Sequence, residues 1–368
     1  MLRVFLLLIV MATSILAESA HQYVMRTFDR SQPGAAMIVR KHGRTVYAVN
    51  LGRRDLRTKA PLDARTNFRL ASVTKQFTAT AVMLLVRHGK LRYCTRLTEV
   101  FPDFPAYCHE VTIRHLLNHT SGLPDYEELM DHAGRRWTAE QQITDVEVLE
   151  LLKRASGLKF APGTHWSYSN SGYVVLGLVA AQVSGEPFDE FLAERIFKPL
   201  HMSNTVAYVK DKNVVPYRAF GHVREGGKLV ERDQSSTSAT LGDGGVYSNI
   251  DDLIRWDEAL RNHRLLTATE MQPALTPVRL NDGSIPYWDS GPGDTDPQHG
   301  KPVQYGFGWF LDPYQGHERM WHYGDTTGFQ TAIQRFPKDD LTIIVLCNRT
   351  DVDPTEIALH FADDYLRR

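Results

Sequence analysis

The stretch NFRLASVTKQFTATAVMLLVRH (residues 67–88) joins a short strand-like segment to a long apolar run. Residues 79–86 are apolar apart from Thr80, and Gly89 follows the run as a helix terminator. A helix that is apolar on every side must be buried on every side. The stretch therefore predicts a strand that leads directly into a helix at the centre of a folded domain.

Strand-like patterns lie toward the two ends of the chain, and helical patterns lie between them. Residues 35–40 and 45–50 flank a turn at 41–44 and predict a hairpin. Further strands are predicted at 308–311, 319–323, 329–334 and 341–347, and a closing helix at 354–366. Helices between them are predicted at 145–154, 172–183, 188–197 and 251–260, the first opening on a capping box formed by Thr144 and Glu147.

This order of elements predicts an α/β fold of the α+β type. We expect a mostly antiparallel sheet, built from both chain ends (residues 21–71 plus 240–368) and flanked by helices. A mainly helical domain (72–239) would be inserted between the two parts of the sheet domain. Because ligand sites favour domain junctions, we expect the active site in the cleft between the two domains.

The composition narrows the class of protein. The 368 residues are 42% hydrophobic and 23% charged, which excludes collagen-like and disordered chains. Lys and Arg number 42 against 43 Asp and Glu, and this balance argues against a nucleic-acid partner. The mature chain contains no apolar run long enough for a transmembrane span, which needs about 20 residues.

Residues 1–17 resemble a signal peptide. Arg3 supplies a positive start, residues 4–11 are apolar, and residues 12–17 are mostly small and neutral up to Ala17. The alternative is an N-terminal helix or a retained anchor. We expect an exported protein, periplasmic or secreted, that is cut near Ala17.

The three cysteines agree with export without requiring it. Cys94 and Cys108 bracket a loop-like stretch and are a possible disulfide, which would close a loop of about 15 residues. The alternative is two unpaired thiols. Cys347 lies in a pattern typical of a buried strand, which predicts an unreactive thiol in the core. The spacings of Cys and His do not resemble a zinc site, and we expect neither a metal nor a cofactor.

The first candidate for chemistry is Ser72-Val73-Thr74-Lys75, at the start of the buried helix. Residues three apart share a helix face, so the Lys75 amine can reach the Ser72 hydroxyl. A lysine among apolar neighbours loses solvation, which lowers its pKa and makes a neutral amine available as a base. The alternative is a capping serine and a lysine that extends to solvent.

The second candidate is Tyr168-Ser169-Asn170, in a turn that leads into a helix. Tyr168 and Asn170 are two residues apart and can point to the same side of an extended loop. A phenol near Lys75 can pass protons, and an amide can hydrogen-bond a substrate carbonyl. The alternative is a core tyrosine followed by an asparagine helix cap.

The third candidate is His322-Tyr323-Gly324-Asp325, near the end of a predicted strand. Gly324 lets the backbone approach a ligand closely, and the N–H group of Asp325 can serve an oxyanion. A cationic His322 would hold a substrate carboxylate, in which case affinity would fall as the pH rises from about 6 to 8. The alternative is a structural histidine.

Together these motifs resemble the serine β-lactamase and penicillin-binding-protein superfamily, in the branch of class C β-lactamases, D-alanyl-D-alanine carboxypeptidases and related esterases. The segments at 115–124, 244–253 and 305–309 also resemble that family, so the likeness covers about residue 30 to residue 350. Ser-x-x-Lys, Tyr-x-Asn and a His-x-Gly version of Lys-Thr-Gly occur in the family's order.

The resemblance implies a serine hydrolase that works through an acyl-enzyme. Ser72 would be the nucleophile, Lys75 its proton acceptor and Tyr168 the acid or base for the leaving group and the water. The residues implied to bind substrate are Asn170, His322, Gly324 and Asp325, with an oxyanion hole formed by the N–H groups of Ser72 and Asp325.

The third motif departs from the β-lactamase pattern, which places Lys where this chain has His322. Because histidine is largely neutral near pH 7, we expect hydrolysis of a D-amino-acid peptide, an amide or an ester more than of a β-lactam. A non-catalytic sensor or scaffold that kept the fold is the alternative. An esterase of the Ser-His-Asp type needs Gly two residues on either side of its serine, and no serine here has Gly two residues after it.

Overall fold

The computed structural model describes residues 18–288 and 300–366 of the chain. The predicted signal peptide, residues 1–17, lies outside the described residues. The described part begins with helix α1 (Ala20–Thr27), whose first turn is capped by the Ser19 hydroxyl. Within the described ranges, no helix combines the length and the apolar character needed to cross a membrane.

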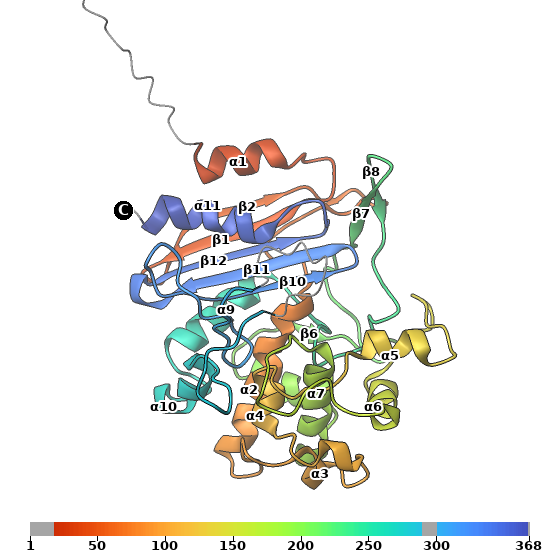
Figure 1. Ribbon diagram of the computed structural model, residues 1–368. Coiled ribbons are helices and arrows are strands. Elements are labelled where there is room, and N and C mark those ends of the chain that lie inside the picture. The colour runs from red at the N-terminus through yellow and green to blue at the C-terminus, as the bar shows by residue number, and fades with distance from the viewer. Residues whose placement is uncertain (1–17, 289–299, 367–368) are drawn as a thin grey trace, which may run out of the picture.

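A five-stranded antiparallel sheet is built from both ends of the chain, as predicted (Figure 1). Its order is β10-β11-β12-β1-β2, and the strands span Met320–Thr326, Phe329–Phe336, Leu341–Cys347, Ala35–Lys41 and Arg44–Leu51, respectively. Every residue of β12 is buried, because β12 lies between two partner strands and has both faces covered. In its middle, Ile344 pairs with Ile38 on one side and Ile333 on the other.

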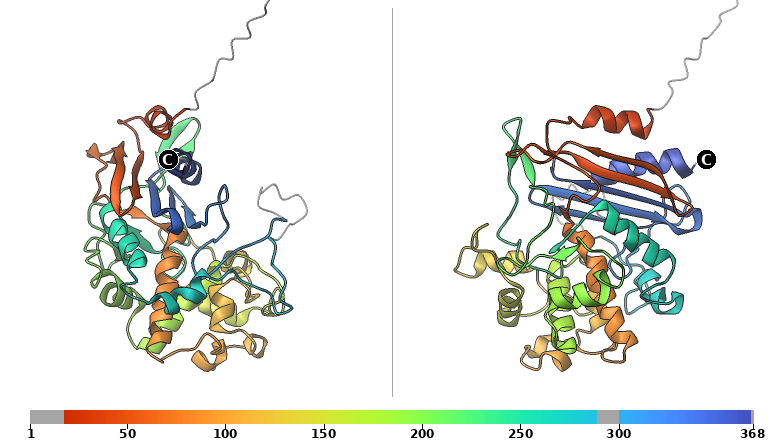
Figure 2. Two further views of the ribbon diagram at one scale, coloured as in Figure 1. Left: turned by 90° about the vertical axis from the view of Figure 1, so that its left-hand side faces the viewer. Right: turned by 180° about the vertical axis from the view of Figure 1, so that it is seen from behind.

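Helices cover the two faces of this sheet. On one face, α11 (Pro354–Leu366) packs against β11 and β12, and α1 packs against α11 (Figures 1 and 2). On the other face, α9 (Ile250–Arg261) packs against β1 and β12 and the larger helical part lies beyond. The two-residue alternation of β1 explains this: Met37 contributes to the core under α11, while Ile38 contributes to the core shared with the helical part.

Helix α2 (Lys75–Arg87) lies in the interior of the helical part and packs against α7 (Asn170–Ser184). Its residues from Lys75 to Leu85 are all buried, which confirms the prediction of a buried helix. The helices around them are α3 (Leu97–Val100), α4 (Ile113–Leu117), α5 (Tyr126–His132), α6 (Asp145–Arg154), α8 (Phe188–Leu192) and α10 (Ala268–Met271).

Small sheets connect the two parts. A three-stranded sheet of order β5-β9-β6 is formed by Phe68–Arg69, Val246–Ser248 and Val206–Ala207. Two ribbons complete the strands: β3 (Arg53–Asp55) with β4 (Ala60–Pro61), and β7 (His222–Glu225) with β8 (Lys228–Glu231). Strand β5 leads directly into the segment before α2, so this small sheet holds the position of Ser72 relative to the main sheet.

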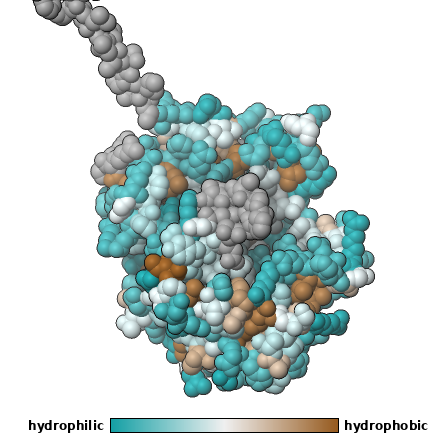
Figure 3. All heavy atoms as spheres, in the orientation of Figure 1, coloured by the Kyte–Doolittle hydropathy of each residue, from teal (hydrophilic) through white to brown (hydrophobic). Residues whose placement is uncertain are grey.

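The surface seen in Figure 3 is mostly hydrophilic, with apolar side chains in small separate groups.

Three predictions of secondary structure and disulfide pairing need correction. Residues 308–311 form no strand, because Gly308 adopts a φ of +76° where the chain passes against α2, and the segment makes only isolated bridges, from Phe310 to Tyr305 and to Trp321. The helix predicted for 188–197 is α8 followed by a π-helical turn, Ala193–Phe197.

The third correction concerns the possible disulfide. Cys94 and Cys108 are both free thiols. The Cys108 side chain is part of the apolar core of the helical region, where burial raises its pKa to about 12, whereas Cys94 is exposed. The two cysteines are close in sequence, but the fold sends their side chains into different environments.

Candidate active site

Ser72 lies in a short 3₁₀ turn, Ala71–Thr74, that precedes α2. Ala71 has a φ of +49°, in the left-handed region that residues other than glycine rarely adopt. The turn is held from the main sheet, since the Thr331 hydroxyl donates to the Leu70 carbonyl over 2.8 Å. Its other residues are buried while Ser72 is partly exposed, so the turn presents the hydroxyl at its surface. Such strained turns are common at functional sites.

Lys75 is fully buried, with 0% exposure. Its Nζ donates to the Ser72 hydroxyl (3.0 Å), to the Asn170 side-chain oxygen (2.8 Å) and to the Asp243 carbonyl (3.0 Å). Burial lowers the pKa of Lys75 from 10.5 to about 8, against the opposing effect of the Asp243 charge. Roughly a tenth of the lysines are therefore neutral at pH 7 and able to accept a proton.

Tyr168 comes close to both groups. The Lys75 Nζ lies 4.9 Å from the centre of the Tyr168 ring. Burial raises the pKa of Tyr168 well above its usual value, and a hydrogen bond with the Ser72 side chain acts in the opposite direction. The phenol is therefore protonated at neutral pH and is placed to donate a proton rather than to accept one.

Asn170 is the first residue of α7, which is capped by the Ser169 hydroxyl. Because the Asn170 side-chain oxygen faces Lys75, its amide nitrogen is the group left to hydrogen-bond a substrate carbonyl. The sequence motif predicts a contact of Asn170 with the substrate, and the fold adds its contact with Lys75.

His119 holds the loop that carries Tyr168. Its carbonyl accepts from the Ser167 N–H (3.0 Å) and its Nδ1 accepts from the Ser169 N–H (3.1 Å), so the loop is fixed on both sides of the tyrosine. The His119 ring packs against the Tyr168 ring with centres 4.4 Å apart. Burial, and then the charge of Lys75, lower the pKa of His119 well below its usual value, so the ring is neutral.

Gly324 brings the third motif against the nucleophile turn. A Cβ atom at this position would lie 2.1 Å from the Leu70 carbonyl oxygen and 3.1 Å from the Ala71 Cβ. Only a glycine permits this approach, which brings β10 against Leu70 and Ala71, the two residues before Ser72. The N–H group of Asp325, the next residue along β10, is the candidate donor to an oxyanion on a Ser72 adduct.

His322 does not present a positive charge to a substrate. It is fully buried, its Nδ1 donates to the Tyr323 carbonyl (2.6 Å), and its Nε2 accepts from the Tyr305 hydroxyl (3.2 Å). Burial, and then the charge of Lys75, lower the pKa of His322 to about 3. The cationic carboxylate holder considered from the sequence is therefore not supported, because the side chain points into the interior.

Asp243 is the group that the sequence analysis missed. It is 6% exposed, its carbonyl accepts from Lys75, and its Oδ2 accepts from the Tyr126 hydroxyl over 3.3 Å. Its Oδ1 is buried without a hydrogen-bond partner among the described residues. The signal in the sequence is the run Gly-Asp-Gly-Gly at residues 242–245. A Cβ atom on Gly242 would lie 2.2 Å from the Tyr173 carbonyl oxygen, so only a glycine at 242 lets the loop come close enough for Asp243 to contact Lys75.

The described site thus brings together a hydroxyl, a buried amine of lowered pKa and a protonated phenol. Such a set can remove a proton from Ser72 as it attacks a carbonyl, and can return a proton to the leaving group. An N–H group at Asp325 can stabilise the tetrahedral oxyanion. The arrangement suits acyl transfer through a covalent intermediate.

Comparison with known proteins agrees with this geometry. The family model described as Beta-lactamase matches residues 18–366. Penicillin-binding protein 4* of Bacillus subtilis (strain 168) is 30% identical over 355 residues, covering 92% of this chain and 73% of that protein. Esterase EstB of Burkholderia gladioli is 29% identical over 335 residues, covering 77% of this chain and 84% of the esterase.

A solved structure shows the same kinship at the level of the fold. The D-amino acid amidase of Ochrobactrum anthropi SV3 superposes with a TM-score of 0.72 at 25% identity, covering 94% of each chain. The mixed fold with its mostly antiparallel sheet is therefore that of β-lactamases and transpeptidases. The chain belongs to the beta-lactamase family, within the superfamily of serine β-lactamases and penicillin-binding proteins.

Proposed function

We propose that the protein is a serine hydrolase that forms an acyl-enzyme on Ser72. The observation that carries the proposal is the 3.0 Å contact between the Lys75 Nζ and the Ser72 hydroxyl, with the amine buried and its pKa lowered. Neutral Lys75 takes the hydroxyl proton as the Ser72 oxygen bonds to the substrate carbonyl carbon. Tyr168 donates a proton to the leaving group as the carbonyl–leaving-group bond breaks, and Lys75 passes its proton to the phenolate.

Deacylation repeats the steps with water. The Tyr168–Lys75 pair accepts a proton from the water as its oxygen bonds to the acyl carbon, and the proton returns to the departing Ser72 oxygen. The N–H groups of Ser72 and Asp325 stabilise the oxyanion in both halves of the reaction. Asn170 orients the acyl carbonyl through its amide nitrogen.

For the substrate, we propose an ester or an amide, including a D-amino-acid amide or peptide, ahead of a β-lactam. The third motif supplies no positive charge, because His322 is buried and neutral. The carboxylate of a β-lactam is held by a positive charge at this position in the β-lactamase pattern, and this chain lacks that charge. An esterase and a D-amino acid amidase among the similar proteins support the same choice.

We also propose that the protein acts after export, in the periplasm or outside the cell. The support is the pattern of residues 1–17, with Arg3 before an apolar run and small residues up to Ala17. Expression of the full chain in a bacterial host, followed by N-terminal sequencing of the exported protein, tests this. A new N-terminus near residue 18 is expected, and an uncut cytoplasmic chain would exclude export.

Intact-mass analysis tests the hydrolase. Wild-type protein is incubated with p-nitrophenyl acetate and, separately, with a fluorescent penicillin, beside the variant Ser72→Ala. We expect an added acetyl or penicilloyl mass on the wild type alone, with turnover of the ester. Equal labelling of both proteins would reject Ser72 as the nucleophile, and a stable adduct without turnover would favour the non-catalytic sensor.

A substrate panel then separates the substrate classes. Nitrocefin, D-Ala-D-Ala peptides, D-amino-acid amides and short-chain esters are compared by kcat/KM at one pH. We expect esters and amides to exceed nitrocefin, because only nitrocefin and the D-Ala-D-Ala peptides carry a carboxylate. The reverse order would show that another group replaces the missing charge.

A further inference from the structure

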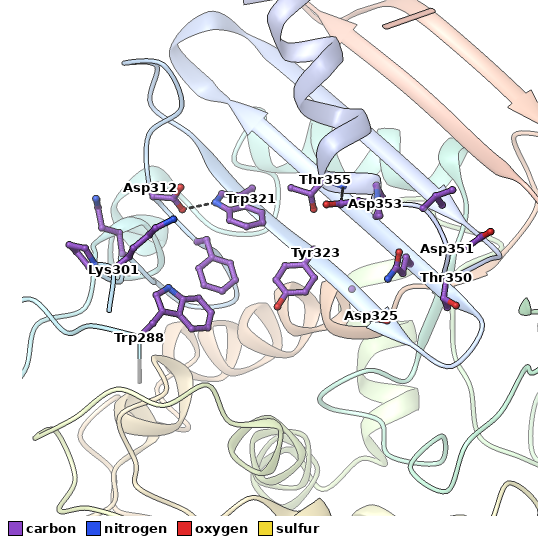
Figure 4. Close-up of a pocket in the computed structure, with 17 residues that line it drawn as sticks. Trp288, Lys301, Asp312, Trp321, Tyr323, Asp325, Thr350, Asp351, Asp353 and Thr355 are labelled. Atoms are coloured by element: carbon purple, nitrogen blue, oxygen red, sulfur yellow. Dashed lines mark hydrogen bonds between the residues drawn. The ribbon is translucent and has the colours of Figure 1, made fainter. Parts of the chain in front are cut away.

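A cavity of about 710 Å³ lies on the outer face of β10, between the start of α11 and the chain at 301–312 (Figure 4). This is within the range of volumes of small-molecule sites. Gly324 lines the cavity and also abuts the turn that carries Ser72. The cavity and the turn before Ser72 therefore meet at Gly324, with the cavity on the face of β10 that points away from His322 and the turn on the other face.

Aromatic rings form one wall of the cavity. The centre of the Phe310 ring lies 5.0 Å from that of Trp321 and 5.6 Å from that of Trp288, and the Trp288 pair is stacked at 18°. The Trp321 and Tyr323 rings follow at 6.0 Å and 26°. Tyr323 is 40% exposed, and the indole N–H of Trp321 donates to Asp312, which fixes that ring. Trp321 and Tyr323, which both line the cavity, thus lie with their ring planes within 26° of each other, and aromatic ring faces attract cations.

Carboxylates line the same cavity, but three of them already have partners. Asp312 pairs with Arg319, and Asp351 pairs with arginines that belong to neighbouring segments. Asp353 accepts the first N–H groups of α11. These three carboxylates therefore have partners that do not come from the cavity.

Asp325 differs from these three. Its side chain is exposed at the surface of β10, and the protein atoms around it raise the pKa of the carboxyl group, against the opposing influence of a hydrogen bond with the Gln330 side chain. The Gln330 side-chain oxygen is buried and has no hydrogen-bond donor among the described residues. In Figure 4, Asp325 lies toward one end of the cavity, while Lys301 and Trp288 lie toward the other. The cavity therefore has an acidic end at Asp325 and a basic end at Lys301.

We propose that this cavity is a subsite for an organic ammonium group carried by the substrate. The group lies against the ring faces of Trp321 and Tyr323 and pairs with the Asp325 carboxylate. An apolar or aromatic body extends along the wall toward Trp288, where the charge of Lys301 disfavours a second cation. That the ammonium group belongs to a substrate rests on the proposed hydrolase. Binding of a cation in the cavity can be measured without any reaction.

Binding is measured first, by titration calorimetry on the whole protein. The probes are benzyltrimethylammonium, the neutral benzyl alcohol and the anion benzoate. We expect the cation to bind at least about fivefold more tightly than the alcohol, and benzoate to bind least. Equal binding of cation and alcohol, or tighter binding of benzoate, would overturn the proposal.

Variants then locate the probe. Asp325→Asn and Trp321→Leu are compared with Asp211→Asn, an equal charge change at an exposed position outside the cavity. We expect the preference for the cation to fall at least about threefold in the first two and to persist in the third. An unchanged preference in both cavity variants would show that the cation binds elsewhere. Because preference is a ratio within one protein, an overall loss of binding in a damaged variant does not imitate the result.

Kinetics connect the cavity to turnover. Phenyl acetates carrying a trimethylammonio, a tert-butyl or a carboxylate group are compared by kcat/KM. We expect the cationic ester to be preferred over its neutral isostere by about the same factor as in binding. If all three esters are inert and Ser72 forms no adduct, the proposed hydrolase fails while the binding result stands. If they react without preference for charge, the subsite fails while the hydrolase stands.

Discussion

The Lys75 Nζ lies 3.0 Å from the main-chain oxygen of Asp243, and the carboxylate of the same aspartate is the charge that most strongly opposes the effect of burial on that amine. One residue thus hydrogen-bonds the amine through its backbone and sets its charge through its side chain. Asp125, which caps α5, and Glu127 in its first turn add to the same electrostatic effect. Two neutral histidines, His119 and His322, and the Tyr168 phenol also lie near the amine.

The first prediction concerns the pH dependence of activity. Lys75 must be neutral to accept a proton, so kcat/KM should rise with pH through an apparent pKa of about 8. Asp243→Asn removes a charge that favours the protonated amine, which shifts this rise to lower pH and increases the relative activity at pH 6.5. Asp211→Asn is the control. A profile unchanged in Asp243→Asn would mean that another group governs the rise.

Tyr168→Phe tests the phenol. Loss of the proton donor should lower kcat by about 10²–10⁴-fold, with little change in thermal stability. Tyr173→Phe is the matched control, since its hydroxyl donates to the Leu117 carbonyl over 2.8 Å and lies in the same aromatic cluster. That variant should lose about 1 kcal/mol of unfolding free energy and retain activity. Comparable activity losses in the two variants would remove Tyr168 from its proposed role.

Gly324→Ala tests the contact between β10 and the nucleophile turn. The added Cβ would lie 2.1 Å from the Leu70 carbonyl oxygen and 2.5 Å from the Thr331 hydroxyl oxygen, so β10 must move away from the turn. We expect a loss of about 1–3 kcal/mol in unfolding free energy and a larger relative loss of kcat, because the Asp325 N–H moves with the strand. Gly316→Ala, at an open loop position of positive φ, controls for backbone strain alone. A Gly324→Ala variant with wild-type kcat would show that the close approach is dispensable.

His322 should not act as a pH switch for carboxylate binding. Its pKa of about 3 leaves the ring neutral from pH 5 to pH 8. With Ser72→Ala to prevent reaction, the affinity for benzylpenicillin should not follow a histidine titration across that range. An affinity that falls tenfold per pH unit above pH 6 would restore the cationic role considered from the sequence.

Asp145 should make stability depend on pH. Its Oδ1 accepts from the Leu241 N–H over 3.0 Å, and burial raises its pKa to about 8. The folded state therefore holds a proton that the unfolded state releases near pH 4, so this group destabilises the fold progressively as the pH rises from about 4 to about 8. Asp145→Asn keeps the acceptor and removes the titration. Its melting temperature should fall less than that of the wild type between pH 5 and pH 8, and parallel curves would contradict the raised pKa.

Local sequence was sufficient for the elements and for the nearest neighbours in the site. The apolar run before Gly89 determined a buried helix, and the capping box at Thr144 determined where α6 begins. The spacing of Ser72 and Lys75 determined their contact, because three residues is close to one turn of helix. In each case the deciding interaction lies within a few residues along the chain.

Contacts between distant segments decided the rest. Burial of His322 follows from Tyr305 and from the strand position it occupies, and it turned an expected cation into a neutral ring. Asp243 reaches Lys75 across 168 residues because a glycine beside it fits between α2 and α7. Packing between distant segments also leaves Cys94 exposed and Cys108 buried. Solvation and charge depend on which distant groups share a volume, and that is a property of the packed fold rather than of any short stretch of the chain.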